Sequence, residues 1–312
     1  MTETMTILAS LAPVFLVMAL GYWAGRTKAF DNHNIGSLNA LVMEFALPAA
    51  LFTTMAQASR KAMLDQAQLA LVLLAAMLAA YAVTYAVQRI WYGHDRRESA
   101  LIALTASGPN VGSAGLPIVA VLFSKSASIS VAVAVAVAAV VVTPISLLLL
   151  ESGAGKSANG LSVMRKALLQ PIVIAPVLGL ICSLAGFALP PLVESTLALV
   201  GQGASGTALF LTGLVLSAQP VKLSGNVGLT VAMKNVLQPL LTALLALPLL
   251  DGAEARVAVM LMAVPSGAFG VLFAVRYGVA SAQIGTMLIA STLLSTVTLT
   301  AAILLSSGWS WV

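Results

Sequence analysis

The stretch Thr105-Ala-Ser-Gly-Pro-Asn-Val-Gly-Ser-Ala-Gly-Leu-Pro117 places two prolines, three glycines and Asn110 inside an apolar segment. A continuous helix cannot easily pass through it, because proline lacks a backbone donor and clashes with the preceding turn, and glycine weakens a helix. Val264-Pro-Ser-Gly-Ala-Phe-Gly270 interrupts a later apolar segment in the same way. Backbone groups freed by such breaks cannot face lipid, so they must pair or line a wet cavity. Two matched breaks predict a transporter with its site at the breaks.

The composition around these breaks is that of a chain dissolved in a bilayer. The 312 residues are 60% hydrophobic and 8% charged, with a mean hydropathy of +1.03. Apolar runs of about 20 residues follow one another, as helical spans require and β-barrel strands do not. The predicted fold class is an all-α membrane protein with ten transmembrane helices, at about 5–25, 36–57, 67–91, 98–123, 127–150, 166–188, 192–218, 223–250, 254–279 and 281–306.

The fifteen Lys and Arg residues predict the orientation. Lys234 lies inside the eighth span, and four residues (Arg60, Lys61, Lys125 and Arg256) lie on one side. The loops on the other side hold the remaining ten, Arg26, Lys28, Arg89, Arg96, Arg97, Lys156, Arg165, Lys166, Lys222 and Arg276. Positive loops face the cytoplasm, so both termini are expected on the non-cytoplasmic side of the inner membrane. Basic residues scattered in this way are typical of contacts with the lipid bilayer, and no nucleic acid partner is expected.

The two halves of the chain align with each other. A shift of 158 residues places Pro13 on Pro171, Gly21 on Gly179 and Ala50-Leu-Phe52 on Ala208-Leu-Phe210; a shift of 156 places Glu98 on Glu254 and Pro109 on Pro265. Each half holds five helices, so the second half enters the membrane from the opposite side and the repeat is inverted. The expected domains are a first repeat at 1–150, a Gly- and Ser-rich cytoplasmic linker at 151–165 and a second repeat at 166–312.

Two ionisable residues lie within apolar spans. Lys234 is near the middle of the eighth span, where an unpaired ammonium costs at least about 2.5–3.5 kcal/mol. It is either a counter-charge for a carboxylate substrate or a structural group bonded to another residue or to backbone carbonyls. Glu44, in the second span, either relays protons, since burial raises a carboxylate pKa, or is the partner of a polar helix end.

The candidate binding site combines both breaks with the polar face of the eighth span. Half-helices that resume after a break offer N–H donors and a positive dipole to an anion. The alternative is that the breaks only kink packed helices. No cofactor or metal is expected. The candidate substrate-binding residues are Ser107, Pro109, Asn110, Gly112, Ser113, Pro117, Lys234, Gln238, Pro265, Ser266 and Gly267, with Glu44 as the coupling candidate.

Three motifs make the chain resemble the auxin efflux carrier family, whose bacterial members include permeases for malonate, malate and related organic acids. The motifs are Pro109-Asn-Val-Gly-Ser-Ala-Gly-Leu-Pro117, Met262-Ala-Val-Pro-Ser-Gly267 with Ala274-Val-Arg-Tyr-Gly278, and Ser291-Thr-Leu-Leu-Ser295. The resemblance implies the fold of sodium/proton antiporters and bile-acid symporters, in which broken helices 4 and 9 cross. It also implies a scaffold of helices 1, 2, 6 and 7, often dimeric, and a moving transport domain of helices 3–5 and 8–10. The family's crossover asparagine corresponds to Asn110, and its prolines are among Pro109, Pro117 and Pro265.

The expected function is secondary transport of a small organic anion by alternating access. The cargo would be a mono- or dicarboxylate such as malonate or malate, or an auxin-like acid, and a homodimer is the expected assembly. The alternative is a sodium- or proton-coupled antiporter or symporter of the same fold for another solute. Such a carrier usually has carboxylates at the crossing, whereas neither broken segment contains Asp or Glu between Glu98 and Phe123 or between Arg256 and Gly278. An enzyme is disfavoured, because the sequence has no paired intramembrane aspartates and no His-Glu-x-x-His motif.

Overall fold

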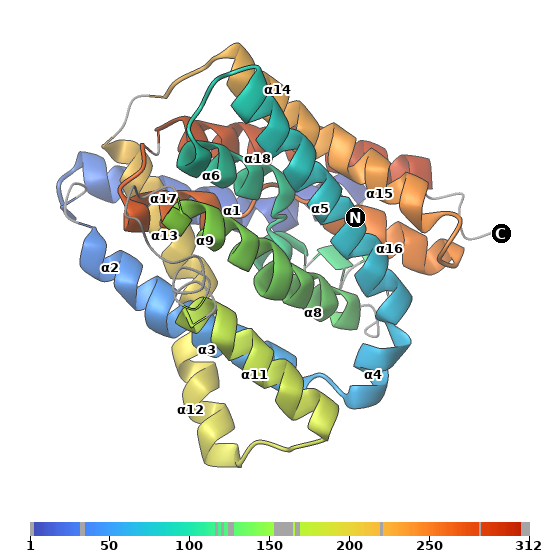
Figure 1. The fold of residues 1–312 in the computed structure, drawn as a ribbon. Coiled ribbons are helices and arrows are strands. Elements are labelled where there is room, and N and C mark those ends of the chain that lie inside the picture. The colour runs from blue at the N-terminus through green and yellow to red at the C-terminus, as the bar shows by residue number, and fades with distance from the viewer. Residues whose placement is uncertain are drawn as a thin grey trace.

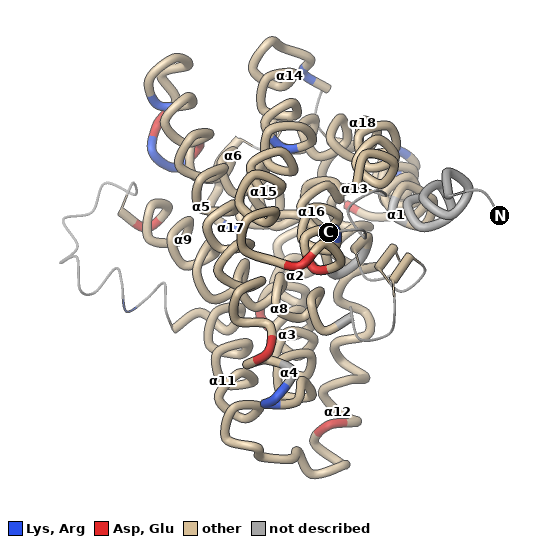
Figure 2. The backbone as a smooth tube through the Cα atoms, turned by 90° about the vertical axis from the view of Figure 1, so that its right-hand side faces the viewer, with Lys and Arg blue, Asp and Glu red and all other residues tan. Residues whose placement is uncertain are grey.

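The computed structural model describes residues 3–31, 35–115, 118–119, 122–123, 128–152, 165, 169–218, 221–280 and 282–306. Within these residues the secondary structure is helical, apart from one isolated β-bridge between Pro109 and Ser266. Figure 1 shows the helices packed as one bundle, with α11 (Pro171–Ala185) and α12 (Pro191–Gln202) at one end and α14 (Gly225–Ala232) at the other. Lys, Arg, Asp and Glu are few, and most of the backbone carries none of them (Figure 2).

Helices occur in each of the ten predicted apolar segments. Those of the first half are α1 (Glu3–Arg26), α2 (Gly36–Ala40), α3 (Leu47–Gln57), α5 (Ala67–Ile90), α6 (Arg96–Ser107), α8 (Ser128–Val137) and α9 (Thr143–Ser152), and a short helix, α4 (Arg60–Asp65), lies between the second and third segments. Those of the second half, besides α11, α12 and α14, are α13 (Ala204–Ser217), α15 (Gln238–Ala246), α16 (Gly252–Ala263), α17 (Phe269–Tyr277) and α18 (Ala282–Ser306).

Prolines explain why several of these helices are divided. The π-helical segments Leu41–Ala46, Ala138–Val142 and Met233–Leu237 join α2 to α3, α8 to α9 and α14 to α15. Each ends two residues before a proline, namely Pro48, Pro144 and Pro239. A proline ring clashes with the carbonyl four residues earlier, and here that carbonyl lies in the widened π turn. The chain therefore continues across the proline without a full break.

The membrane class is confirmed at the level of whole helices. Among the described residues, six continuous helices are long and apolar enough to cross a bilayer: Gly36–Gln57, Ala67–Ile90, Ile129–Ser152, Pro191–Ser217, Gly225–Ala246 and Ala282–Ser306. Most of the predicted linker at 151–165 lies outside the described residues. Pro117 lies outside them as well.

Two helix pairs, α1 with α13 and α3 with α11, pack closely at glycines. A Cβ added to Gly21 of α1 would lie 2.0 Å from the backbone oxygen of Phe210, and one added to Gly179 of α11 would lie 2.5 Å from that of Phe52. These two contacts exchange places under the 158-residue shift, as the predicted repeat requires. Glycine is needed at both positions because backbone atoms occupy the space of a side chain.

The broken helices begin with matching caps. Asp95 accepts a hydrogen bond from the backbone N–H of Glu98 (2.8 Å) at the start of α6, and Asp251 accepts one from Glu254 (2.8 Å) at the start of α16. Such caps satisfy N–H groups that have no partner within the helix. Both pairs are related by the 156-residue shift.

Candidate functional site at the crossing of the broken segments

The two interrupted segments pair with each other. Asn110 donates its backbone N–H to the carbonyl of Pro265 (2.8 Å), and Gly267 donates its N–H to the carbonyl of Gly108 (2.8 Å). These bonds flank the antiparallel bridge between Pro109 and Ser266. The pairing gives partners to backbone groups that the breaks release inside the apolar core. The two interrupted segments therefore lie against each other and are joined by backbone hydrogen bonds.

The eighth span binds the carbonyl end of both broken helices. Gln238 donates its side-chain amide to the carbonyl of Ser107 at the end of α6 (2.8 Å), and Lys234 donates its ammonium to the carbonyl of Met262 near the end of α16 (2.7 Å). The side chains of Lys234 and Gln238 are fully buried and one helical turn apart. A cation is favourable at a helix C-terminus because the dipole is negative there. In this structure Lys234 bonds to a backbone carbonyl, as one of its two predicted interpretations describes, and its role in substrate binding stays a prediction.

A third set of bonds holds the second break against α18. The backbone N–H of Ser266 donates to the hydroxyl of Ser291 (3.0 Å), and that hydroxyl donates to the side-chain oxygen of Asn235 (2.7 Å). Asn235 in turn donates to the carbonyl of Ser291 (2.8 Å). The sequence analysis named Ser291 only as part of a family motif and did not include it among the candidate site residues.

A buried polar stripe runs along the eighth span, and sequence reasoning recognised only its middle. Its members recur at every fourth position and share one face of the helix: Asn226, Thr230, Lys234, Gln238 and Thr242. At one end Asn226 exchanges two side-chain hydrogen bonds with Gln88 of α5 (2.7 and 2.8 Å). The repeat of four could have been read from the sequence as the face that contacts the crossing.

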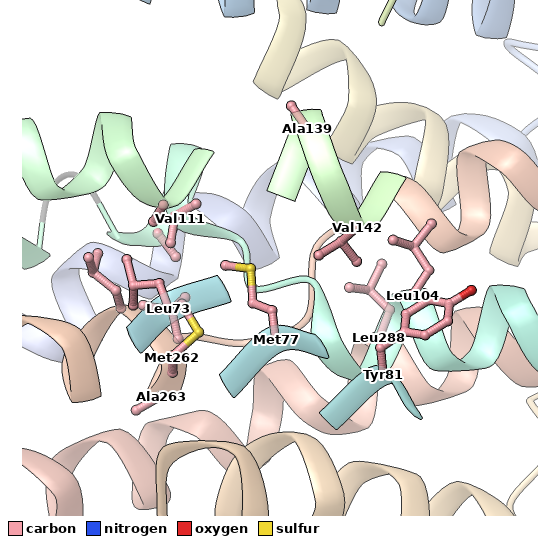
Figure 3. Close-up of a cluster of buried hydrophobic side chains, with 14 of the residues drawn as sticks. Leu73, Met77, Tyr81, Leu104, Val111, Ala139, Val142, Met262, Ala263 and Leu288 are labelled. Atoms are coloured by element: carbon pink, nitrogen blue, oxygen red, sulfur yellow. The ribbon is translucent and has the colours of Figure 1, made fainter. Parts of the chain in front are cut away.

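Apolar packing supports the crossing from the α5 side. Figure 3 shows Leu73, Met77 and Tyr81 of α5 in one cluster with Leu104 of α6 and Met262 of α16. Each of these side chains is at most 5% exposed. Helices α6 and α16 are the half-helices that precede the two breaks. This cluster therefore holds both of them against α5.

A cavity of about 270 Å³ lies beside the crossing. Its walls come from the first break, from the start of α17, from α3, from α8 to α9 and from α13. Three predicted site residues line it: Pro109, Asn110 and Gly267. A Cβ added to Gly267 would lie 3.3 Å from the carbonyl oxygen of Gly108, so the close approach of the two segments restricts this position.

The other predicted residues lie outside the described lining of this cavity. Ser107, Pro265 and Ser266 contribute to the backbone pairing and its hydrogen bonds, while Lys234 and Gln238 contact the crossing from the eighth span. Gly112 and Ser113 belong to the π-helical segment Val111–Gly115, which follows the first break. The side chain of Ser113 and all of Pro117 are outside the described part of the chain.

Three polar lining residues were missed by sequence reasoning: Thr54 of α3, Thr143 of α9 and Ser205 of α13. No signal separates them from the many other Ser and Thr residues in apolar helices. The described lining residues include no Asp, Glu, Lys or Arg. Among all the residues that the structure describes, no group of three His, Cys, Asp or Glu side chains is placed to hold a metal ion.

The N-terminal end of α17 forms one wall of this neutral cavity. Ala268 is the N-cap of α17, Phe269 is its first residue, and both line the cavity. The first N–H groups of a helix have no partner within the helix, and the dipole is positive at this end. A carboxylate can therefore be stabilised here without a lysine or arginine in the wall.

Glu44 lies outside the described lining and forms an ion pair with Arg276, in the last turn of α17 (3.2 Å). Asn39, in the same span as Glu44, donates to the carbonyl of Leu272 in α17 (3.2 Å). Glu44 thus contacts a polar helix end, which was the second of its two predicted interpretations.

The Glu44 pair leads to one prediction about coupling. Glutamine keeps a side-chain oxygen that can accept a hydrogen bond from Arg276, so we expect Glu44→Gln to fold and to lose only a small part of the stability. We also expect the pH dependence of uptake into proteoliposomes to be retained. Loss of that pH dependence in Glu44→Gln, with normal uptake at one fixed pH, would instead support a proton-coupling role.

Comparison with known proteins decides the family. The sequence model of a family described as "Membrane transport protein" matches residues 6–303. The chain belongs to this family. It is a membrane transporter, and its resemblance to the auxin efflux carriers is confirmed.

Several relatives extend over almost the whole transporter. The "Uncharacterized transporter YfdV" of Escherichia coli (strain K12) is 30% identical over 87% of this chain and 88% of its own length. A protein of Rhizobium meliloti named "Putative malonate transporter" is 22% identical over 92% of each chain. An "Uncharacterized transporter" of Methanothermobacter thermautotrophicus is 23% identical over 96% of this chain and 97% of its own.

Proposed function

We propose that this transporter is a secondary carrier that moves a small organic anion across the inner membrane by alternating access. The observation that carries the proposal is the cavity beside the crossing, which is lined by Asn110 and by the start of α17. An amide donor and a positive helix end suit a carboxylate. The name of the Rhizobium meliloti relative also points to an organic acid.

Alternating access is supported by where the cavity lies between two groups of helices. The proposed scaffold, helices 1, 2, 6 and 7, corresponds to α1, Gly36–Gln57, α11 and Pro191–Ser217. Within it, α1 packs on α13 and α3 on α11. On the scaffold side the cavity is bounded by α3 and α13. On the side of the proposed transport domain it is bounded by both breaks and by the segment from α8 to α9. Movement of the second group against the first would expose the anion to either side in turn.

The ten-helix inverted repeat belongs to the same proposal. Its support is the reciprocal glycine contacts of Gly21 and Gly179, the matched caps of α6 and α16, and the antiparallel pairing of the two breaks. The loop charges favour both termini on the non-cytoplasmic side. We propose a homodimer through the scaffold on the basis of the family resemblance alone.

The alternative, a sodium- or proton-coupled carrier for another solute, has less support. Cation sites are built from oxygen ligands, commonly carboxylates, and the described lining offers no carboxylate. Ion dependence of uptake in proteoliposomes distinguishes the two functions.

Asn110→Ala is the direct test of the proposed site. Loss of a hydrogen bond to a charged group costs about 1.5–3 kcal/mol, so we expect substrate affinity to fall about tenfold to a hundredfold. The measurement is the ligand-induced rise in unfolding temperature of the purified protein, together with uptake by proteoliposomes. Gln68→Ala is the control, because Gln68 is an exposed amide on α5 outside the cavity. Equal affinity in Asn110→Ala and wild type would exclude this site.

A further inference from the structure

Polar contacts join the proposed scaffold to the proposed transport domain at one end of the bundle. Asn39 of α2 donates its side-chain amide to the carbonyl of Leu272 in α17 (3.2 Å). One helical turn further along α17, Arg276 forms its ion pair with Glu44 (3.2 Å). Both contacts connect α17 to the first half of the scaffold span Gly36–Gln57.

Tyr277, the last residue of α17, forms a third contact with the scaffold. Its hydroxyl accepts a hydrogen bond from the side-chain amide of Gln170, the N-cap of α11 (2.6 Å), and donates one to Glu151 of α9 (3.0 Å). The backbone carbonyl of Tyr277 accepts a bond from Arg97 of α6. Tyr277 is thus held within the transport domain by α6 and α9, while its bond to Gln170 crosses to the scaffold. We call the three crossing contacts the latch: Asn39–Leu272, Glu44–Arg276 and Gln170–Tyr277.

The latch lies where the cavity ends. Leu272 lines the cavity, and its carbonyl accepts the bond from Asn39. The other latch residues lie outside the described lining. The span Gly36–Gln57 lines the cavity with residues from Leu47 to Thr54 and carries its latch residues before them. The cavity and the latch therefore occupy opposite halves of this span.

The latch is built from weak contacts that can separate. The side-chain oxygens of Asn39 and Gln170 are buried and have no hydrogen-bond partner among the described residues. A buried acceptor without a partner destabilises the arrangement that contains it. The ion pair of Glu44 and Arg276 is partly exposed to solvent, where such pairs contribute little. The closed arrangement is therefore held by several small contributions and can be reversed.

We infer that the latch closes the cavity at the end of the bundle that carries the ten basic loop residues, and that it breaks in each transport cycle. This inference rests on the proposed function, because it requires the transport domain to move against the scaffold. Each latch contact joins one residue of either group, so movement of α17 away from α2 and α11 breaks all three. Weakening one contact raises the population of the state that is open at this end.

A reversible cross-link tests whether the latch must break. The purified full-length protein would carry Cys182→Ser, which removes its one native cysteine, with Glu44→Cys and Arg276→Cys joined by a short bifunctional methanethiosulfonate. In proteoliposomes we expect the bridge to stop uptake of radiolabelled malonate and reduction to restore it. The matched control joins Gln57→Cys to Glu194→Cys, whose native side chains are hydrogen-bonded within the scaffold (2.9 Å), and should leave uptake unchanged. Equal uptake before and after reduction of the Glu44–Arg276 bridge would overturn the inference.

A second measurement needs no transported substrate. Ser205 lines the cavity midway along the scaffold span Pro191–Ser217, so Ser205→Cys reports access to the cavity when vesicles are treated with a membrane-impermeant maleimide from either side. We expect Gln170→Leu to raise the rate of labelling from the side of the basic loops about twofold to tenfold, because one hydrogen bond of the latch is lost. Gln57→Leu removes an amide at the opposite end of the scaffold and should leave that rate unchanged.

The possible results separate the latch from the function on which it rests. Equal labelling of Ser205→Cys in Gln170→Leu and Gln57→Leu would overturn the latch, whatever the proteoliposomes take up. If Gln170→Leu does not fold, Tyr277→Phe removes the same bond, keeps the aromatic ring and is expected to raise labelling in the same way. Faster labelling in the latch variant, without uptake of malonate or butyrate by the wild-type protein, would support the latch and contradict the proposed organic-anion cargo.

Discussion

Lys234→Ala is expected to lower the free energy of unfolding by about 3–5 kcal/mol. The substitution removes a fully buried side chain and leaves the carbonyl of Met262 without its ammonium partner. Truncation of a large buried side chain to alanine costs about 2–5 kcal/mol, and a buried acceptor without a partner costs about 1–3 kcal/mol. The measurement is unfolding of the purified protein in detergent, followed by circular dichroism without ligand.

Lys234→Met separates the structural role of Lys234 from a role as counter-charge. Methionine keeps most of the volume, so the variant should be more stable than Lys234→Ala while still lacking the bond to Met262. If Lys234 holds the two broken segments in position, both variants should lose stability and ligand affinity together. Normal stability with complete loss of anion binding in Lys234→Met would instead support direct contact between Lys234 and the cargo.

The two breaks could be predicted from the sequence because their cause is local. The prolines and glycines at residues 105–117 and 264–270 prevent a continuous helix wherever the surrounding chain lies. Released backbone groups inside the core then have few partners other than each other. The pairing of Asn110 with Pro265 and of Gly267 with Gly108 follows from that shortage.

The roles of the individual polar side chains around the crossing were less predictable. Lys234 and Asn110 are both polar residues in apolar segments, yet one contacts a helix end and the other lines the cavity. The difference depends on how the eighth span is rotated against α6 and α16, which is a property of tertiary packing. Thr54 and Ser205 line the cavity for the same reason, and no local pattern distinguishes them.

Gly213→Ala is expected to force α1 and α13 apart. A Cβ on Gly213 would lie 1.9 Å from the carbonyl oxygen of Met18 and 2.8 Å from the nitrogen of Tyr22. Both are backbone atoms, so no side-chain rotation relieves the overlap, and the helices must separate along the contact. Overpacking of a core usually costs about 1–3 kcal/mol, and we expect a loss at or above the upper end of that range.

Gly206→Ala is the matched control on the same helix. A Cβ at Gly206 meets nothing within 4 Å, and alanine is a better helix former than glycine by about 0.5–1 kcal/mol. Gly206→Ala should therefore leave stability unchanged or raise it. In the proposed scaffold Gly179→Ala, whose Cβ would lie 2.5 Å from the carbonyl oxygen of Phe52, should resemble Gly213→Ala. If Gly213→Ala unfolds at the same temperature as Gly206→Ala, the close packing of α1 on α13 is not what holds these two helices together.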